Sequence, residues 1–163
     1  MGPRTRVHGS ILVVGASGIL APAASVLVSR GAAVTGVGRS RPMPDGVEAV
    51  HVDARDLGAL DAALGSRRWD AALVYDPAVT ESTLPRLAAA IDGRLVRVRT
   101  SAAADPAHGE PALLADTLQL GWHEEGDEVR WHTPDEVSAA ALVVFDDGDP
   151  CTLGVVRPWE RRP

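Results

Sequence analysis

The nine residues 13–21, Val-Val-Gly-Ala-Ser-Gly-Ile-Leu-Ala, interrupt an aliphatic run with small residues. Gly15, Gly18 and Ala21 recur at every third position, between a segment typical of a buried strand and one typical of a helix. In that context the first glycine permits a tight turn, and the second lets a pyrophosphate approach the backbone. The small third residue lets the helix pack on the sheet. The spacing predicts a nucleotide-binding turn, with a turn that holds no ligand as the alternative.

Strand-like and helix-like segments alternate along the first hundred residues. Continuous aliphatic runs predict strands buried on both faces, and glycines end the helical stretches between them. We expect strands at 10–14, 33–37, 47–52, 71–75 and 95–100, and helices at 18–30, 57–64 and 82–91. This alternation indicates a Rossmann-like, doubly wound α/β fold with a parallel sheet covered by helices on both faces.

The pattern changes after residue 104. We expect a helix at 111–120, a β-hairpin formed by 119–124 and 128–133, and a last strand at 152–156. Thr133 and Glu136 have the spacing of a capping box, which predicts a helix from Pro134 to about residue 145. We therefore expect a single domain over residues 1–163, with a nucleotide-binding core at 10–101 and a divergent C-terminal segment at 105–163.

The side chains after the second expected strand indicate which nucleotide binds. In folds selective for NAD, an acidic residue near this point holds the ribose hydroxyls. Here the residues are Arg39, Ser40 and Arg41, and a guanidinium suits the 2′-phosphate of NADP. We expect the cofactor to be NADP(H), with surface solubility as the alternative role for the arginines. The expected cofactor-binding residues are Gly15, Ser17, Gly18, Ile19, Arg39, Ser40, Asp53 and Ala54.

Over residues 10–101 the sequence resembles the short-chain dehydrogenase/reductase family. Residues 15–21 are similar to the glycine fingerprint of its extended and atypical branches, with Ala21 in place of the final glycine. Asp53 falls where that family has an adenine-contacting aspartate, and Ser101 falls where it has its catalytic serine. The resemblance implies a Rossmann fold, a nicotinamide cofactor and oxidoreductase chemistry.

The catalytic Tyr-x-x-x-Lys pair of that family has no counterpart in these 163 residues, which contain no lysine. Catalysis would need a non-standard acid, for which Tyr75, Ser101 and His123 are the candidates. Tyr75 and Ser101 follow or end expected strands, where ligands bind in open α/β sheets. A plain strand role for Tyr75 and a turn role for Ser101 are the alternatives. His123 and His132 lie on the two arms of the expected hairpin and could face each other.

Composition excludes several other classes of function. The single cysteine, Cys151, rules out an internal disulfide and a cysteine-based metal cage, and we expect no metal at His123 because a third clear ligand is missing. Residues 105–149 carry 12 acidic side chains and one arginine, which argues against nucleic-acid binding. No apolar stretch has the roughly 18 residues of a membrane span. We expect a cytoplasmic protein without nucleic-acid or membrane partners.

Three of the four tryptophans, Trp122, Trp131 and Trp159, fall in the divergent segment. A small local core explains them most simply, and a dimer contact or the wall of a substrate pocket are the alternatives. If the chain forms a homodimer, we expect this segment to mediate it.

These observations predict an atypical short-chain dehydrogenase-like protein that binds NADP(H) and oxidises or reduces a small carbonyl or alcohol substrate. Two other interpretations stay open. One is a noncatalytic Rossmann protein that binds a nucleotide or metabolite. The other is a cofactor-independent isomerase or cyclase that reuses the cleft.

Overall fold

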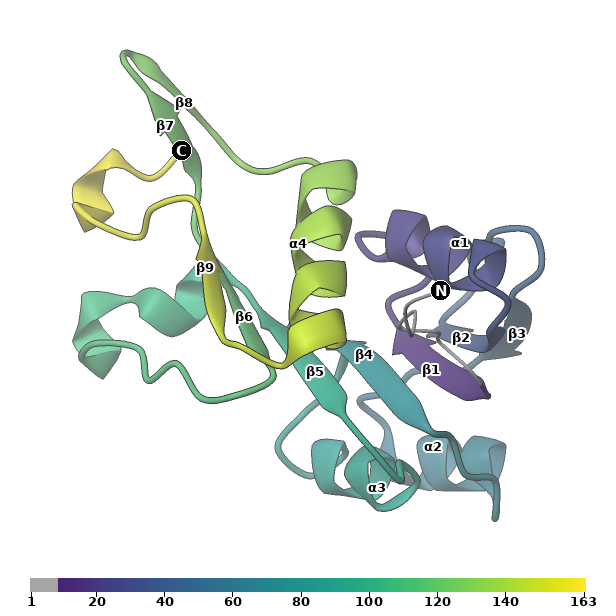
Figure 1. The fold of residues 1–163 in the computed structure, drawn as a ribbon. Coiled ribbons are helices and arrows are strands. Elements are labelled where there is room, and N and C mark those ends of the chain that lie inside the picture. Colours follow the sequence, from purple (N-terminus) through teal and green to yellow (C-terminus); the bar gives the residue numbers. More distant parts are fainter. Residues whose placement is uncertain (1–8) are drawn as a thin grey trace.

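The computed structural model describes residues 9–163, which form one parallel sheet covered by helices on both faces (Figure 1). The strands are β1 Ser10–Val14, β2 Ala33–Gly38, β3 Glu48–His51, β4 Ala71–Tyr75, β5 Leu95–Arg99, β6 Thr117–Leu120 and β9 Cys151–Leu153. The helices are α1 Ala21–Ser29, α2 Leu57–Leu64, α3 Leu84–Ala89 and α4 Pro134–Asp147. A separate hairpin joins β7, His123–Glu125, to β8, Glu128–Arg130. The expected α/β Rossmann-like fold is confirmed.

The strand order positions a ligand site. The seven strands run parallel in the order β3-β2-β1-β4-β5-β6-β9. From β1 the chain proceeds to one edge of the sheet, and then returns through β4 toward the other edge. In open α/β sheets, ligands bind where the order reverses, outside the carboxyl ends of the strands. Here that crevice lies between the ends of β1 and β4.

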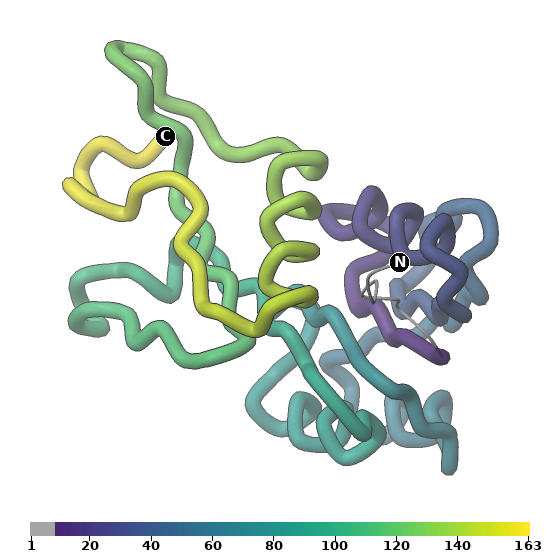
Figure 2. Tube along the Cα trace, viewed as in Figure 1, coloured from purple at the N-terminus to yellow at the C-terminus, as the bar shows by residue number. Residues whose placement is uncertain are grey.

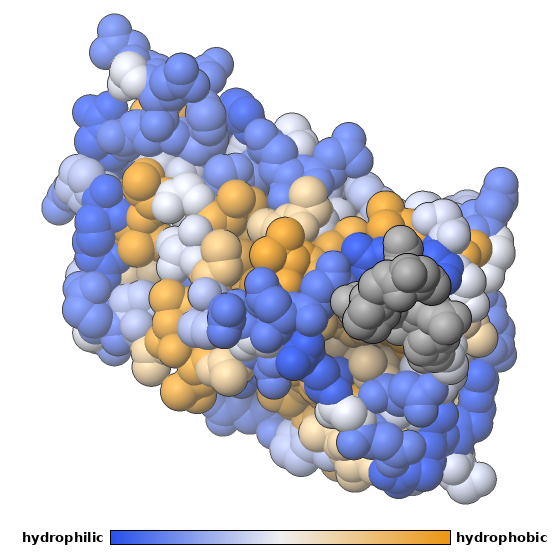
Figure 3. All heavy atoms as spheres, viewed as in Figure 1, coloured by the Kyte–Doolittle hydropathy of each residue, from blue (hydrophilic) through white to orange (hydrophobic). Residues whose placement is uncertain are grey.

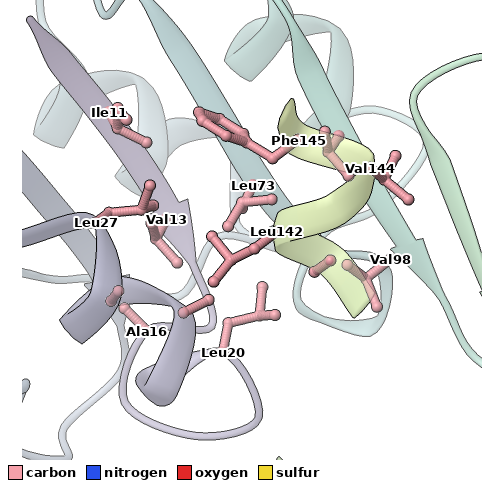
Figure 4. Close-up of a cluster of buried hydrophobic side chains, with 14 of the residues drawn as sticks. Ile11, Val13, Ala16, Leu20, Leu27, Leu73, Val98, Leu142, Val144 and Phe145 are labelled. Atoms are coloured by element: carbon pink, nitrogen blue, oxygen red, sulfur yellow. The ribbon is translucent and has the colours of Figure 1, made fainter. Parts of the chain in front are cut away.

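Alternating side chains of each strand enter two separate apolar cores. From β1, Ile11 and Val13 join the core beneath α1 and α4, whereas Leu12 and Val14 join the core beneath α2 and α3. All four side chains are at most 1% exposed, so the strand is buried on both faces. Figure 4 shows the first core, in which side chains of α1 and α4 point toward β1, β4 and β5. The continuous aliphatic sequence of β1 follows from this double burial.

One expected element is wrong. Residues 111–120 do not form a helix: residues 111–114 have no regular structure, and Thr117–Leu120 is strand β6. All four residues of β6 are buried, because the strand pairs in parallel with β5 on one side and with β9 on the other. Figure 2 shows the chain from β5 leading out through a long irregular segment before it returns as β6. Tertiary pairing therefore overrides the helical propensity of the leucines and alanines.

The C-terminal segment otherwise follows expectation, except that its strands are shorter and that residues 119 and 120, expected in the first arm of the hairpin, belong to β6. The hairpin and the capping box at Thr133 and Glu136 are both present, and α4 begins at Pro134. Trp122 is fully buried and packs edge-on against Trp131 and Trp159, which confirms a local apolar cluster. Figure 3 shows polar side chains over the hairpin and apolar ones gathered over α4 and β9. Among residues 9–163, no helix combines the length and the apolar character needed to span a membrane.

Candidate functional site

A cleft of about 300 Å³ lies at the crevice beside the carboxyl ends of β1, β2 and β4. The glycine turn forms one wall, and the residues that follow β2, β3 and β4 form the others. Seven of the eight expected cofactor-binding residues line it, namely Gly15, Ser17, Gly18, Ile19, Arg39, Asp53 and Ala54. Ser40 is exposed and does not line the cleft. Residues far apart in the sequence thus meet in one place, although their binding roles stay predictions.

The two glycines of the turn are needed for different reasons. Gly15 has φ +101°, and a Cβ atom there would lie 3.0 Å from Cβ of Tyr75, so the fold itself requires glycine. Gly18 is different, because its φ lies outside the left-handed region and a Cβ atom would have no neighbour within 4 Å. Neither backbone strain nor protein packing explains a glycine at position 18. The open space beside it is where a ligand could approach the backbone closely.

The turn also presents backbone donors. The N–H groups of Ser17 and Ile19 have no hydrogen-bond acceptor among residues 9–163. The N-cap of α1, Leu20, has no side chain that could satisfy the first turn of the helix. Unpaired N–H groups at a helix N-terminus attract anions, especially phosphates. The turn is held in place from α4, where the Ser138 hydroxyl donates a 3.1 Å hydrogen bond to the Ile19 carbonyl oxygen.

Arg39 and Arg41 supply positive charge at the end of the cleft that follows β2. Both side chains belong to exposed residues that line the cleft, and neither forms a hydrogen bond or ion pair within the described chain. Many other arginines in the structure are paired, as Arg30 is with Asp146 at 2.8 Å. Two unpaired guanidinium groups at the edge of a cleft can bind an anionic group of a ligand.

Asp53 lines the same cleft but is partly engaged by the protein. One of its oxygens, Oδ1, accepts hydrogen bonds from the backbone N–H and from Nε of Arg55, at 3.0 and 3.3 Å. These bonds, the first above all, lower the pKa of the Asp53 carboxyl from its usual value, with a smaller contribution from Arg39. Oδ2 has no partner among residues 9–163 and can still accept a hydrogen bond from a ligand.

Tyr75, the last residue of β4, lies between the cleft and a second cavity and lines both. Its hydroxyl forms no hydrogen bond within the described chain, and burial raises the pKa of the phenol above its usual value. The group is therefore a protonated hydrogen-bond donor near neutral pH. Ile19 is the other residue shared by the two cavities.

The second cavity, of about 180 Å³, opens beside the carboxyl ends of β5 and β6. Its lining includes Ser101, so the structure brings together two of the three candidate catalytic residues, Tyr75 and Ser101. We call it the hydroxyl pocket. It is lined by Ile19, Tyr75, Thr100, Ser101, Leu120, Gly121, Trp131, His132 and Val137.

The third candidate, His123, lies elsewhere. Its Nε2 atom is 3.3 Å from Glu128 and 3.6 Å from Glu125 on the hairpin, and it lines neither cavity. The imidazole that lines the hydroxyl pocket is His132, whose ring packs edge-on against that of His123 with 6.4 Å between centroids. The two histidines thus do face each other, although His132 lies after β8 and not on an arm of the hairpin. Within residues 9–163, no three histidine, cysteine or acidic side chains are grouped so as to hold a metal ion.

Sequence reasoning missed several residues of the site. Arg55 could have been found, because an aspartate two residues before it favours the local turn that engages its side chain. Trp131 was not missed, because the wall of a substrate pocket is one alternative for the three C-terminal tryptophans. His132 carries no such signal, since it reaches the hydroxyl pocket only through the packing of the segment between β8 and α4.

No family model matches the sequence, and no curated protein matches it. Solved structures share its fold. A short-chain dehydrogenase from Streptomyces avermitilis superposes with a TM-score of 0.60 at 17% identity, covering 91% of this chain and 89% of that one. A short-chain dehydrogenase/reductase mutant from Serratia marcescens gives a TM-score of 0.60 at 15% identity, with 91% and 95% covered.

The Bordetella bronchiseptica enzyme WbmH, solved in complex with NAD+, gives a TM-score of 0.61 at 10% identity, with 91% of this chain and 75% of that one covered. At these identities the likeness shows the fold alone. The chain has the Rossmann-type fold with a parallel sheet that is also found in short-chain dehydrogenase/reductases.

Proposed function

We propose that the protein binds NADP(H) in the cleft and acts as an oxidoreductase on a small carbonyl or alcohol substrate. The cleft lies at the reversal of strand order, where a dinucleotide binds in this fold. The unpaired N–H groups of the glycine turn suit the pyrophosphate, and the open space beside Gly18 lets it approach.

The two arginines that follow β2 are the reason why we propose NADP and not NAD as the cofactor. Arg39 and Arg41 line the cleft without a protein partner, whereas no acidic residue occupies positions 38–42. An acidic residue there would bind the ribose hydroxyls of NAD and repel a 2′-phosphate, and a guanidinium does the opposite. Asp53, with one free carboxylate oxygen, supports adenine binding from the end of β3.

The cofactor would exchange a hydride with the substrate, and the chain's own residues would handle the proton. Tyr75 lies where the two cavities meet and keeps its hydroxyl protonated, so it suits donation of a proton to a carbonyl oxygen during reduction. Ser101 offers a second hydroxyl from the other wall and would orient the same oxygen.

One observation favours a noncatalytic alternative. The pKa of Tyr75 is raised by burial alone, and no cationic group contributes to its value. Such a phenol donates hydrogen bonds well but transfers its proton reluctantly. A protein that binds NADP(H) without turning it over, as a sensor or a noncatalytic subunit, would fit the same cleft.

Parallel calorimetric titrations with NADPH and NADH test the proposed function. We expect micromolar affinity for NADPH and much weaker affinity for NADH, and we expect Arg39→Asp to remove most of that preference. Arg162→Ala is the control, because Arg162 is an exposed arginine stacked on Trp159 and lines neither cavity. The proposal would be overturned if neither NADPH nor NADH bound, or if the affinity for NADPH were unchanged in Arg39→Asp.

A further inference from the structure

The hydroxyl pocket is lined almost entirely by uncharged groups. Of its nine residues, eight are apolar, glycine or hydroxyl-bearing, and no arginine or acidic residue is among them. Moving an ionised carboxylate or phosphate into such surroundings costs far more than moving a neutral molecule, unless a cation compensates.

One lining residue, His132, can carry a charge, but its ring nitrogens are not accessible to a ligand in the pocket. Its side chain is 6% exposed, and both ring nitrogens are covered by protein atoms. Nδ1 lies 3.5 Å from the Glu136 carboxylate, and Nε2 lies close to Gly154. Neither nitrogen has a hydrogen-bond partner within residues 9–163, and because both are covered, neither can donate directly to a ligand in the pocket.

The arginine that precedes Trp131 in the sequence, Arg130, is already paired within the protein. Arg130 donates two hydrogen bonds to the carboxylate of Glu136, at 2.8 and 3.0 Å. Glu136 accepts a third from the Thr133 N–H at 2.9 Å, which fixes it at the start of α4. Arg130 and Glu136 therefore neutralise each other, and this pair leaves no free charge for a ligand.

The polar groups that remain are hydroxyls. Those of Tyr75, Thr100 and Ser101 form no hydrogen bond within the described chain, and none is a fully covered atom. A hydroxyl can donate to a carbonyl oxygen or accept from an alcohol, so these groups suit either partner of a carbonyl–alcohol pair. Tyr75, at the junction with the cleft, places this polar end next to the nucleotide site.

The volume and the apolar residues of the pocket limit the size and the polarity of the ligand that fits. Its volume of about 180 Å³ lies below the roughly 300 Å³ at which pockets for drug-sized ligands begin. Leu120, Val137 and the half-exposed Trp131 form an apolar wall, and Trp131 packs edge-on against buried Trp122. Such a wall suits a compact hydrocarbon or aromatic group.

We infer that the hydroxyl pocket binds a small, uncharged, largely apolar molecule that carries one hydroxyl or carbonyl oxygen, and that it excludes anions of the same size. That this molecule is the substrate rests on the proposed function. The preference for a neutral ligand rests on the lining of the pocket alone.

Benzyl alcohol and benzoate are probes of nearly equal size that differ in charge. We expect calorimetry or ligand-detected NMR to show benzyl alcohol binding at least about tenfold more tightly than benzoate near neutral pH. Trp131→Ala should weaken benzyl alcohol severalfold, because it removes a partly exposed wall without opening the core. Equal affinities for the two probes, or an affinity unchanged in Trp131→Ala, would overturn the inference.

A charge introduced into the pocket should reverse the selectivity. Ser101 is partly exposed at the start of a short 3-10 helix, so Ser101→Arg can be tolerated by the fold. We expect this variant to lose affinity for benzyl alcohol and to gain affinity for benzoate. Ser66→Arg is the matched control, because Ser66 is exposed and lines neither cavity, and it should leave both affinities unchanged.

NADPH titrations of the same preparations separate the two claims. Binding of NADPH without selective binding of benzyl alcohol would overturn the inference and leave the proposed cofactor site intact. Selective, Trp131-dependent binding of benzyl alcohol without NADPH binding would support the pocket and overturn the proposed oxidoreductase.

Discussion

The Ser138 hydroxyl, in the first half of α4, donates a 3.1 Å hydrogen bond to the carbonyl oxygen of Ile19 in the glycine turn. The two residues are 119 positions apart in the sequence, and Ser138 is 2% exposed. Ile19 lines both cavities, and Val137 beside Ser138 lines the hydroxyl pocket. The helix of the divergent segment thus fixes the position of the turn that we propose holds the nucleotide.

Removing this bond should affect both the fold and the cleft. We expect Ser138→Ala to lower the free energy of unfolding by about 1 kcal/mol, because a partly buried carbonyl loses its partner. It should also weaken NADPH binding severalfold by loosening the turn. Urea unfolding and calorimetry measure the two effects. Ser29→Ala is the control: it removes a helical hydroxyl that bonds Val26 at 2.7 Å on an exposed surface, and NADPH affinity should not change.

The two glycines of the turn should separate a structural role from a binding role. Gly18→Ala meets no atom within 4 Å, so we expect unfolding free energy within about 0.5 kcal/mol of the starting protein but clearly weaker NADPH binding. Gly15→Ala should destabilise the fold by roughly 1–3 kcal/mol, because it strains φ at +101° and crowds Tyr75. Undiminished NADPH binding by Gly18→Ala would place the phosphates elsewhere.

Local signals made much of the fold predictable. The aliphatic run of β1, the glycine turn and the capping box at Thr133 each depend on residues close together in the sequence. Seven of the expected cofactor-binding residues meet in one cleft because each follows a strand of a parallel sheet, and parallel strands end at the same edge.

Long-range packing decided what the sequence could not show. Strand β6 has leucines and a nearby proline that locally favour other structures, and it became a strand because β5 and β9 pair with it. The hydroxyl pocket combines residues from six separate stretches of sequence, from Ile19 to Val137. His132 rather than His123 lines it, and alternation along an expected hairpin gave no reason to choose between them.

The proposed reaction depends on one hydroxyl. Because the Tyr75 hydroxyl has no partner within the described chain, we expect Tyr75→Phe to leave the free energy of unfolding within about 0.5 kcal/mol of the starting protein. If Tyr75 donates the proton, NADPH-dependent reduction of a small neutral aldehyde should fall about 10²–10⁴-fold, with NADPH affinity retained. Steady-state kinetics checks this. Turnover unchanged in Tyr75→Phe would show that Tyr75 is only a strand residue. Absence of any activity in the starting protein would favour the noncatalytic alternative.

The ion pair between Arg130 and Glu136, beside the hydroxyl pocket, should make the free energy of unfolding depend on pH. Hydrogen bonds from Arg130 and then from the Thr133 N–H hold the pKa of Glu136 far below its ordinary 4.5. A carboxyl whose pKa is lowered by folding stabilises the protein above the unfolded value, and this contribution is lost as pH falls below about 4.5.

Glu136→Gln tests this because glutamine can keep the capping box while it loses the charge. We expect the variant to be less stable than the starting protein near neutral pH, and the difference to shrink as the pH is lowered through about 4 and below. Urea unfolding at several pH values measures it. Glu81→Gln is the control, since Glu81 is exposed without a partner in residues 9–163. Its free energy of unfolding should differ little from that of the starting protein at any pH. A Glu136→Gln difference that does not change with pH would show that the carboxylate acts only as a cap and that its charge does not stabilise the pocket wall.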